Sequence, residues 1–185
     1  GMILRGTFLA RQRDLDWLVK EGDNRFFPDA WRDFIAPIPE GERSDIVSAY
    51  YRRMQGDDER QRQMIAAAWA RWTGRIVTWL FPEPAAGATM EAPVHEVAIE
   101  THYAQHRYFM EENQILDNVN KIPRVPLTII HGRRDLTCTV DASYELYEAL
   151  PGVELQIIHE GGHLASEPVM TDALVRATDA MAERL

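Results

Sequence analysis

The sequence predicts an α/β fold in which a helical region is followed by alternating strands and helices. From about residue 8 to about residue 110, apolar residues recur at helical spacing. From about residue 124 to the end, short apolar runs alternate with amphipathic stretches, an order that favours a parallel sheet. We therefore expect strands of a parallel sheet with flanking helices, together with an all-helical region.

The first, helical region is divided by glycine, proline and aspartate into several short helices. In the last of them, Val97, Ile99, Tyr103 and Tyr108 are the expected buried residues. Asp58 and its neighbours are expected to end one helix and cap the next. The predicted helices cover residues 11–20, 28–35, 44–54, 59–72 with a continuation toward 79, and 94–109.

The second region contains two apolar runs, each followed by a turn and a helix. Residues 125–132 read as a buried parallel strand and residues 153–159 as a second strand parallel to it, and residues 141–150 and 168–185 read as the helices after them. After a short segment at 1–8, we expect a helical region at 9–112 and a β-α-β-α region at 113–185.

Composition excludes several classes of protein. The 185 residues carry a formal net charge of −9, which is unlike the basic footprint of a nucleic-acid binder. The single cysteine cannot form an internal disulfide, which favours the cytoplasm. No apolar run has the length of a membrane span or a secretory signal. We expect no cofactor, and we expect Gly1 to remain from tag cleavage, with Met2 as the natural start.

Two strand ends carry the residues of chemical interest. Asp135 follows the first predicted strand of the β-α-β-α region, and His163 follows the second. Because neighbouring parallel strands end at one edge of a sheet, these side chains are expected to meet there. An aspartate that accepts a hydrogen bond from an imidazole fixes its tautomer and stabilises the imidazolium, as in a nucleophilic triad. A turn-forming Asp and a surface His are the alternative interpretations.

These segments resemble those of the prolyl aminopeptidases, or proline iminopeptidases, which are α/β-hydrolase serine exopeptidases. The similar segments are HGRRDLTC at 131–138, GHLASEP at 162–168 and LRGTFL at 4–9, along with points in the helical region such as WARW at 69–72. The resemblance implies a partial α/β-hydrolase fold that contains the last strands of the parallel sheet, with a residual sheet strand at 1–8 and the region around 9–112 as the helical cap. It also implies removal of an N-terminal residue, proline by resemblance, from a peptide or amino-acid amide.

The resemblance assigns a role to each matching residue. Asp135 is the expected triad acid and His163 the expected general base. Glu100 matches a cap carboxylate that binds the free α-amine, where a buried anion would favour an ammonium group. At the neighbouring substrate-binding positions, Thr73 stands in place of a second carboxylate, and Tyr103 is followed by Ala104 in place of an aromatic residue. Each lost contact is typically worth about 1–3 kcal/mol.

The serine nucleophile of the family lies in a G-x-S-x-G elbow, and this sequence contains no such motif. We therefore expect a chain truncated before the nucleophile, inactive alone, which self-associates or binds a second chain carrying the remaining half. The alternative is a non-catalytic remnant that acts as a binding or dimerisation module. A metal site is not expected: His102 and His106 can share a helix face, but no third ligand is evident.

Overall fold

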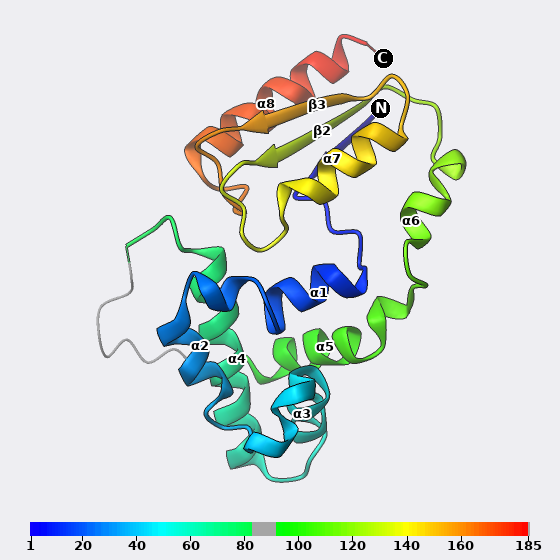
Figure 1. Ribbon diagram of the computed structural model, residues 1–185. Coiled ribbons are helices and arrows are strands. Elements are labelled where there is room, and N and C mark those ends of the chain that lie inside the picture. The colour runs from blue at the N-terminus through cyan, green and yellow to red at the C-terminus, as the bar shows by residue number, and fades with distance from the viewer. Residues whose placement is uncertain (83–91, 185) are drawn as a thin grey trace. The chain divides into compact units, whose positions relative to one another are not determined.

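The computed structural model describes residues 1–82 and 92–184, which form two compact units. One unit comprises Gly1–Leu9 and Glu112–Leu185, and the other comprises Ala10–Glu111 (Figure 1). We call them the sheet unit and the helical unit and describe each separately. Among the described residues, none of the helices combines the length and apolar character needed to cross a bilayer.

The sheet unit is built on three parallel strands in the order β1-β2-β3. Their bounds are β1 Met2–Arg5, β2 Leu127–Gly132 and β3 Glu154–Ile158. Leu4 is in register with Ile129, and Ile129 with Leu155. The predicted parallel sheet is therefore confirmed, and its central strand is buried along its whole length.

Helices cover both faces of this sheet. Successive side chains of β2 point to opposite faces, and apolar residues on each face pack against a helix. Ile130 packs against α8, Pro168–Ala182, through Met170 and Ala173. Ile129 faces the other way and packs with Leu146 of α7, Val140–Ala149. Two short helical turns, α6 at Gln114–Asp117 and η4 at Val119–Lys121, contribute apolar side chains to the same cluster. This arrangement confirms the expected partial α/β-hydrolase fold.

The helical unit contains five α-helices and three short 3₁₀ turns among its described residues. Asp45 and Asp58 cap two of the helices by accepting hydrogen bonds from the backbone of Ser48 and Gln61. The bounds are α1 Gln12–Val19, η1 Asp23–Arg25, α2 Pro28–Ile35, η2 Glu40–Asp45, α3 Ile46–Met54, α4 Glu59–Val77, α5 Val94–Gln105 and η3 Arg107–Phe109.

Stacked aromatic rings form the core of the helical unit. The ring of Phe34 stacks on Tyr50 at 4.8 Å and on Trp72 at 5.3 Å, and the Tyr50 hydroxyl donates to the Phe34 carbonyl. Burial raises the pKa of Tyr50. The Trp72 indole donates to the carbonyl of Leu18 at 2.9 Å, so the Tyr50 hydroxyl and the Trp72 indole both have partners.

The predicted helix at 94–109 is wrong at its end and on one face. It stops at Gln105, because Arg107, Tyr108 and Phe109 adopt left-handed backbone conformations with φ of 51° to 56°. The buried stripe is Val94, Val97, Thr101 and Ala104, which recur at helical spacing. Ile99 and Tyr103 lie off that stripe and are 59% and 46% exposed, whereas Val97 is buried as predicted.

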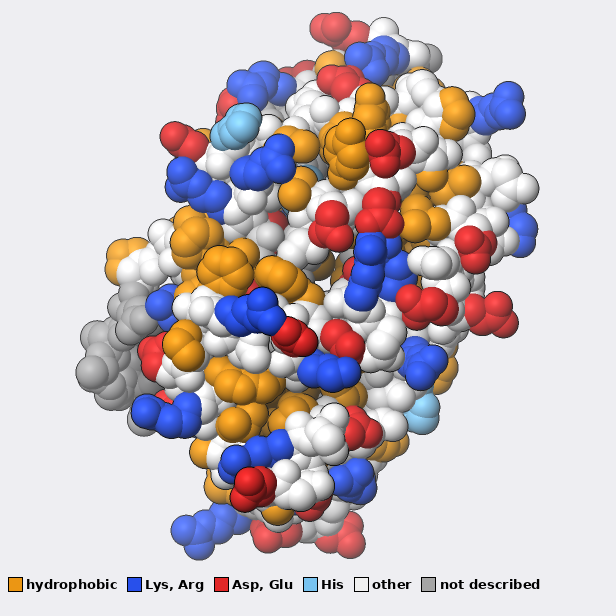
Figure 2. Space-filling model, in the orientation of Figure 1, with side chains coloured by type: hydrophobic (Ala, Val, Ile, Leu, Met, Phe, Trp, Pro, Cys, Tyr) orange, Lys and Arg blue, Asp and Glu red, His pale blue; other side chains and the backbone are white. Residues whose placement is uncertain are grey.

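The surface carries charges of both signs. On the face shown in Figure 2, Lys and Arg alternate with Asp and Glu, and apolar side chains lie between them. That face therefore has no continuous basic stripe of the kind that follows a nucleic-acid backbone.

Candidate functional site

The site in the sheet unit begins where β2 and β3 end. Gly132 closes β2, and a Cβ atom there would lie 2.3 Å from the carbonyl oxygen of Gly162 and 2.4 Å from that of Gly161. Only glycine allows this close approach. The turn that carries Asp135 and the turn that carries His163 are therefore held side by side.

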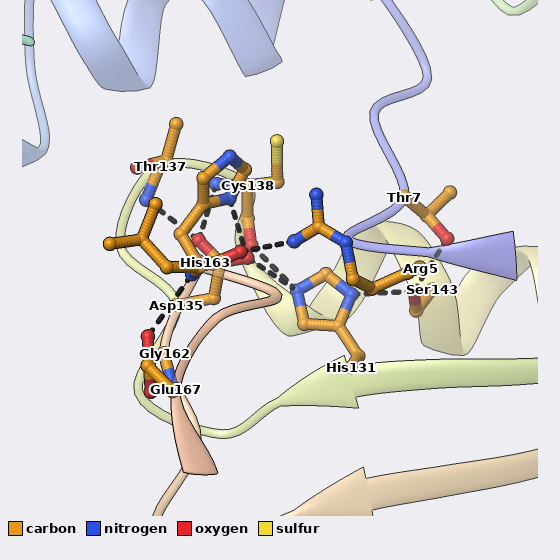
Figure 3. Close-up of polar contacts among 11 residues, drawn as sticks. Arg5, Thr7, His131, Asp135, Thr137, Cys138, Ser143, Gly162, His163 and Glu167 are labelled. Atoms are coloured by element: carbon orange, nitrogen blue, oxygen red, sulfur yellow. Dashed lines mark hydrogen bonds and ion pairs between the residues drawn. The ribbon is translucent and has the colours of Figure 1, made fainter. Parts of the chain in front are cut away.

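Asp135 and His163 meet at this edge, as the sequence predicts. The imidazole Nδ1 lies 3.0 Å from Asp135 Oδ2, and the dashed line between them in Figure 3 marks this contact. The aspartate side chain is 1% exposed, whereas the imidazole is 22% exposed. A hydrogen bond from Nδ1–H to a buried carboxylate leaves Nε2 unprotonated in the neutral ring and able to accept a proton.

The second carboxylate oxygen of Asp135 is held by the backbone of its own turn. The amide groups of Thr137 and Cys138 each donate to Oδ1 at 2.9 Å. The carboxylate is thus oriented by two peptide groups on one side and by the imidazole on the other. Such a group keeps one direction, which is what a residue that orients a general base requires.

The turn that carries His163 has its own support, which the sequence analysis missed. The buried carboxylate of Glu167 accepts from the amide groups of Gly162 at 2.7 Å and Leu164 at 3.0 Å, and the Arg5 guanidinium donates to the His163 carbonyl. An acidic residue directly before Pro168 at the start of a helix was an available signal for Glu167. The contact from Arg5 joins residues 158 apart and had no local signal.

A second imidazole, that of His131, lies in the same site. It belongs to β2, is 0% exposed, and places Nε2 3.5 Å from Asp135 Oδ2. Burial lowers its pKa, against the attraction of the Asp135 carboxylate. In the sequence this residue opens the HGRRDLTC segment, where no local pattern indicates its role.

The helical unit contains the other predicted residues, and among them the side chain of Glu100 is oriented by a hydrogen bond from another helix. Its Oε2 accepts a hydrogen bond from the buried indole of Trp69 at 2.6 Å. The expected burial of this anion is wrong, because Glu100 itself is exposed on α5. The indole therefore orients a carboxylate that remains open to solvent.

Thr73 and Tyr103 have different surroundings. The Thr73 hydroxyl donates to the carbonyl of Trp69 at 3.2 Å, one turn earlier in its own helix. Tyr103 packs edge-on against Phe109 with ring centroids 5.4 Å apart, whereas Ala104 is 3% exposed and points into the core of the unit. An aromatic pair is thus present at Tyr103, supplied by a residue beyond the predicted motif.

The two histidines of α5 and its C-cap lie on one face, as their spacing predicts. The rings of His102 and His106 are 4.6 Å apart and lie beside Tyr51 and Phe109. No group of three or more His, Cys, Asp or Glu side chains suited to a metal ion occurs within residues 1–82 and 92–184.

Comparison with known proteins identifies the relatives of this chain, although no protein-family model matches it. It is 40% identical to a proline iminopeptidase of Xanthomonas citri over 184 residues, which are 98% of this chain and 59% of the relative. The chain is a homologue of the proline iminopeptidases. It is also 41% identical to the Xylella fastidiosa (strain Temecula1) protein of that name, over 96% of this chain and 58% of the relative.

The relationship extends beyond bacteria. A proline iminopeptidase of Arabidopsis thaliana is 36% identical over 98% of this chain and 49% of its own length. The chain thus spans about half to three fifths of the length of these curated relatives. The resemblance to the proline iminopeptidase family, drawn from the strand-end motifs, is confirmed.

Proposed function

We propose that this chain supplies the acid and the general base of a prolyl aminopeptidase-like serine exopeptidase. The observation that carries the proposal is the hydrogen bond between His163 Nδ1 and the buried Asp135 Oδ2. The names of its relatives support the reaction class. The substrate is a peptide or amino-acid amide with a free N-terminus, proline by resemblance.

In this reaction His163 moves one proton in each of the two half-reactions. Its Nε2 accepts the proton of the serine hydroxyl as the hydroxyl oxygen attacks the scissile carbonyl, and then gives that proton to the leaving amine. The Asp135 carboxylate stabilises the imidazolium formed between the two steps. Water then releases the acyl group by the same route in reverse.

The serine comes from outside these 185 residues. The four serines present are Ser44, Ser48, Ser143 and Ser166, and none has glycine two residues before and two after. Ser143 is fully buried and bonded to His131. We propose that a segment carrying the G-x-S-x-G elbow completes the site, and that the 185-residue polypeptide has no turnover alone.

Glu100 is assigned to the free amine of the substrate. An exposed carboxylate whose direction is fixed by the Trp69 indole can accept hydrogen bonds from an ammonium group. This assignment explains selection for a free N-terminus, because an acylated amine carries no charge to pair with the carboxylate.

A second candidate function is a non-catalytic binding or dimerisation module. The surroundings of Thr73 favour this second function, because its hydroxyl is hydrogen-bonded within its own helix and cannot replace the carboxylate of the family pattern. The module would act in the cytoplasm, as a homo-oligomer or with a second chain. Light scattering at micromolar concentration tests the assembly, and a stable monomer would exclude self-association.

Activity of a chimera separates the two functions. The segment of the Xanthomonas citri enzyme that this chain does not match is fused ahead of Met2, and proline, alanine and other aminoacyl-naphthylamides are assayed. We expect turnover by the chimera, none by the 185-residue chain, and loss of the chimera's activity in His163→Ala. The exposed His159 provides the matched control, and His159→Ala is expected to remain active.

A folded chimera with no turnover of any substrate would favour the non-catalytic module. The genomic DNA upstream of Met2 gives an independent result. An in-frame G-x-S-x-G there would place the nucleophile on the same polypeptide, and a stop codon would place it on another.

A further inference from the structure

A buried polar network lies behind the Asp135–His163 pair, and its centre is His131. The ring is 0% exposed, with Nε2 2.7 Å from the carbonyl oxygen of Cys138 and Nδ1 2.6 Å from the hydroxyl oxygen of Ser143. Ser143 Oγ lies in turn 2.7 Å from Thr7 Oγ1. The network therefore joins the end of β2, the turn of the triad acid, α7 and the segment after β1 (Figure 3).

The Cys138 carbonyl determines where the proton of His131 lies. A carbonyl oxygen can only accept, so Nε2 must carry hydrogen. In the neutral ring Nδ1 is then an acceptor, and the Ser143 hydroxyl donates to it. The hydroxyl of Thr7 is left to donate to Ser143, so that every member of the chain has a partner.

A protonated His131 would disturb this order. Both ring nitrogens would then donate, and the Ser143 hydroxyl would have to turn toward Thr7. Burial disfavours the charged ring and lowers its pKa; His163 and Arg5 act in the same direction, whereas the Asp135 carboxylate and the hydrogen bond to the Cys138 carbonyl oppose them. His131 is thus a neutral group with one defined tautomer.

The same residue, Cys138, connects His131 to the triad acid. Its carbonyl accepts from His131 Nε2, and its amide donates to Asp135 Oδ1 at 2.9 Å. The His131 Nε2 atom also lies 3.5 Å from Asp135 Oδ2, the oxygen that accepts from His163. With its hydrogen directed to the Cys138 carbonyl, His131 leaves Oδ2 to His163.

We propose that His131 is a positioning residue for the Asp135–His163 pair. It anchors the peptide of Cys138, and through that peptide it fixes the direction of the Asp135 carboxylate. The catalytic meaning of this role rests on the proposed function, but the geometric claim concerns the 185-residue chain alone. The His163 tautomer reports it, because the hydrogen bond to Asp135 selects Nδ1–H.

Two amide substitutions test the role with nearly matched chemistry. In His131→Gln the amide nitrogen can reach the position of Nε2 and donate to the Cys138 carbonyl. In His131→Asn the shorter side chain can reach only the position of Nδ1, beside Ser143. Long-range ¹H–¹⁵N correlation spectra of the 185-residue chain at neutral pH identify the tautomer of each histidine.

We expect His163 to be an Nδ1–H tautomer in the parent and in His131→Gln. In His131→Asn we expect a mixture in which Nε2–H predominates, as in an unconstrained imidazole. Retention of Nδ1–H by a folded His131→Asn variant would overturn the proposal, even with a lowered Tm, since that result indicates a merely structural role. Loss of Nδ1–H in a folded His131→Gln variant would also overturn it.

The parent chain provides a test that needs no stable variant. We expect His131 itself to be neutral and protonated at Nε2 between about pH 7 and pH 8, above the ordinary pKa of histidine, because burial lowers its own pKa further. A charged His131, or one protonated at Nδ1, would overturn the proposal whatever the fate of the variants. All of these spectra are independent of turnover, so failure of the proposed function would leave them interpretable.

Discussion

Two carboxylates, Asp135 in the sheet unit and Glu100 in the helical unit, are held in different ways. Asp135 follows a strand, is 3% exposed, and receives hydrogen bonds from two backbone amides and an imidazole. Glu100 lies on a helix face, is exposed, and receives a hydrogen bond from the indole of Trp69. One is fixed by the turn that contains it, and the other by a side chain from another helix.

The difference in burial and hydrogen bonding suits the two carboxylates to different roles. A buried carboxylate held by peptide groups cannot turn toward a ligand, but it can hold an imidazole in one orientation throughout a reaction. An exposed carboxylate held at one oxygen keeps room to bind a cation that arrives from solvent. We therefore expect changes at Asp135 to act on the chemical step, and changes at Glu100 to act on substrate binding.

Replacement of the buried carboxylate should produce the largest effect. Asp135→Asn in the active chimera is expected to lower kcat by about 10⁴-fold, because an amide no longer selects the required tautomer of His163. Steady-state kinetics with a prolyl-naphthylamide measures the change. The control is Asp141→Asn, an exposed position in the first turn of α7. An Asp135→Asn effect confined to KM would remove the distinction between the two carboxylates.

Weakening the hydrogen bonds that Glu167 makes to the His163 turn should have a smaller effect, and we expect it as a lower free energy of unfolding. Glu167→Gln replaces one of two accepting oxygens with an NH₂ group that faces a backbone amide, which costs about 1–3 kcal/mol. Urea denaturation of the 185-residue chain measures the free energy of unfolding. The exposed Glu160 in the same turn provides the control, and Glu160→Gln should change stability by less than about 0.5 kcal/mol. Equal changes in the free energy of unfolding for the two variants would argue against a stabilising role of the Glu167 hydrogen bonds.

Neutralisation of the exposed carboxylate should affect recognition. Glu100→Gln can still accept from the Trp69 indole, but it removes the charge that pairs with an ammonium group. We expect kcat/KM of the chimera to fall about 10–100-fold, mostly through KM. Glu96→Gln, an exposed position one turn earlier on α5, is the control. A fall in kcat with KM unchanged would place Glu100 in the chemical step.

The sequence predicted the parts of the fold that short-range patterns determine. The apolar run that ends at Gly132 predicted β2, and the placement of Asp135 and His163 after neighbouring strands predicted their meeting. Each of these follows from strand alternation and from the common edge of a parallel sheet.

The sequence could not predict features that depend on distant contacts. The contact between Ser143 and Thr7 joins residues 136 apart, and the resulting network at His131 has no local signature. The end of α5 could not be predicted either, because the left-handed conformations beyond Gln105 are adopted by Arg107, Tyr108 and Phe109, none of which is a glycine. The exposure of Ile99 followed from the true buried face of α5, which is centred on Val97 and Thr101.

A third carboxylate, Glu42, sharpens the comparison because it is well held without being buried. Its oxygens accept from Arg53 at 2.9 and 3.0 Å and from Arg52 at 2.6 Å. The hydrogen bonds from Arg53 and then Arg52 lower its pKa from 4.5 to about 2. Both carboxylates are therefore held in one orientation by hydrogen bonds. What distinguishes Asp135 from Glu42 is that Asp135 is buried.

The smallest expected effect comes from these partly exposed ion pairs of Glu42. Because the folded-state pKa of Glu42 lies below its unfolded value, its stabilisation is complete above about pH 4.5 and is lost as the pH falls toward 2. Glu42→Gln should lower the Tm slightly at pH 7, and the difference between parent and variant should shrink below about pH 4.5 and disappear only as the pH falls below about 2. Melting curves from pH 7 to about pH 1.5 measure this. A difference of undiminished size at the lowest pH would mean that Glu42 acts through packing, since its carboxyl group is then largely protonated in the folded protein as well as in the unfolded chain.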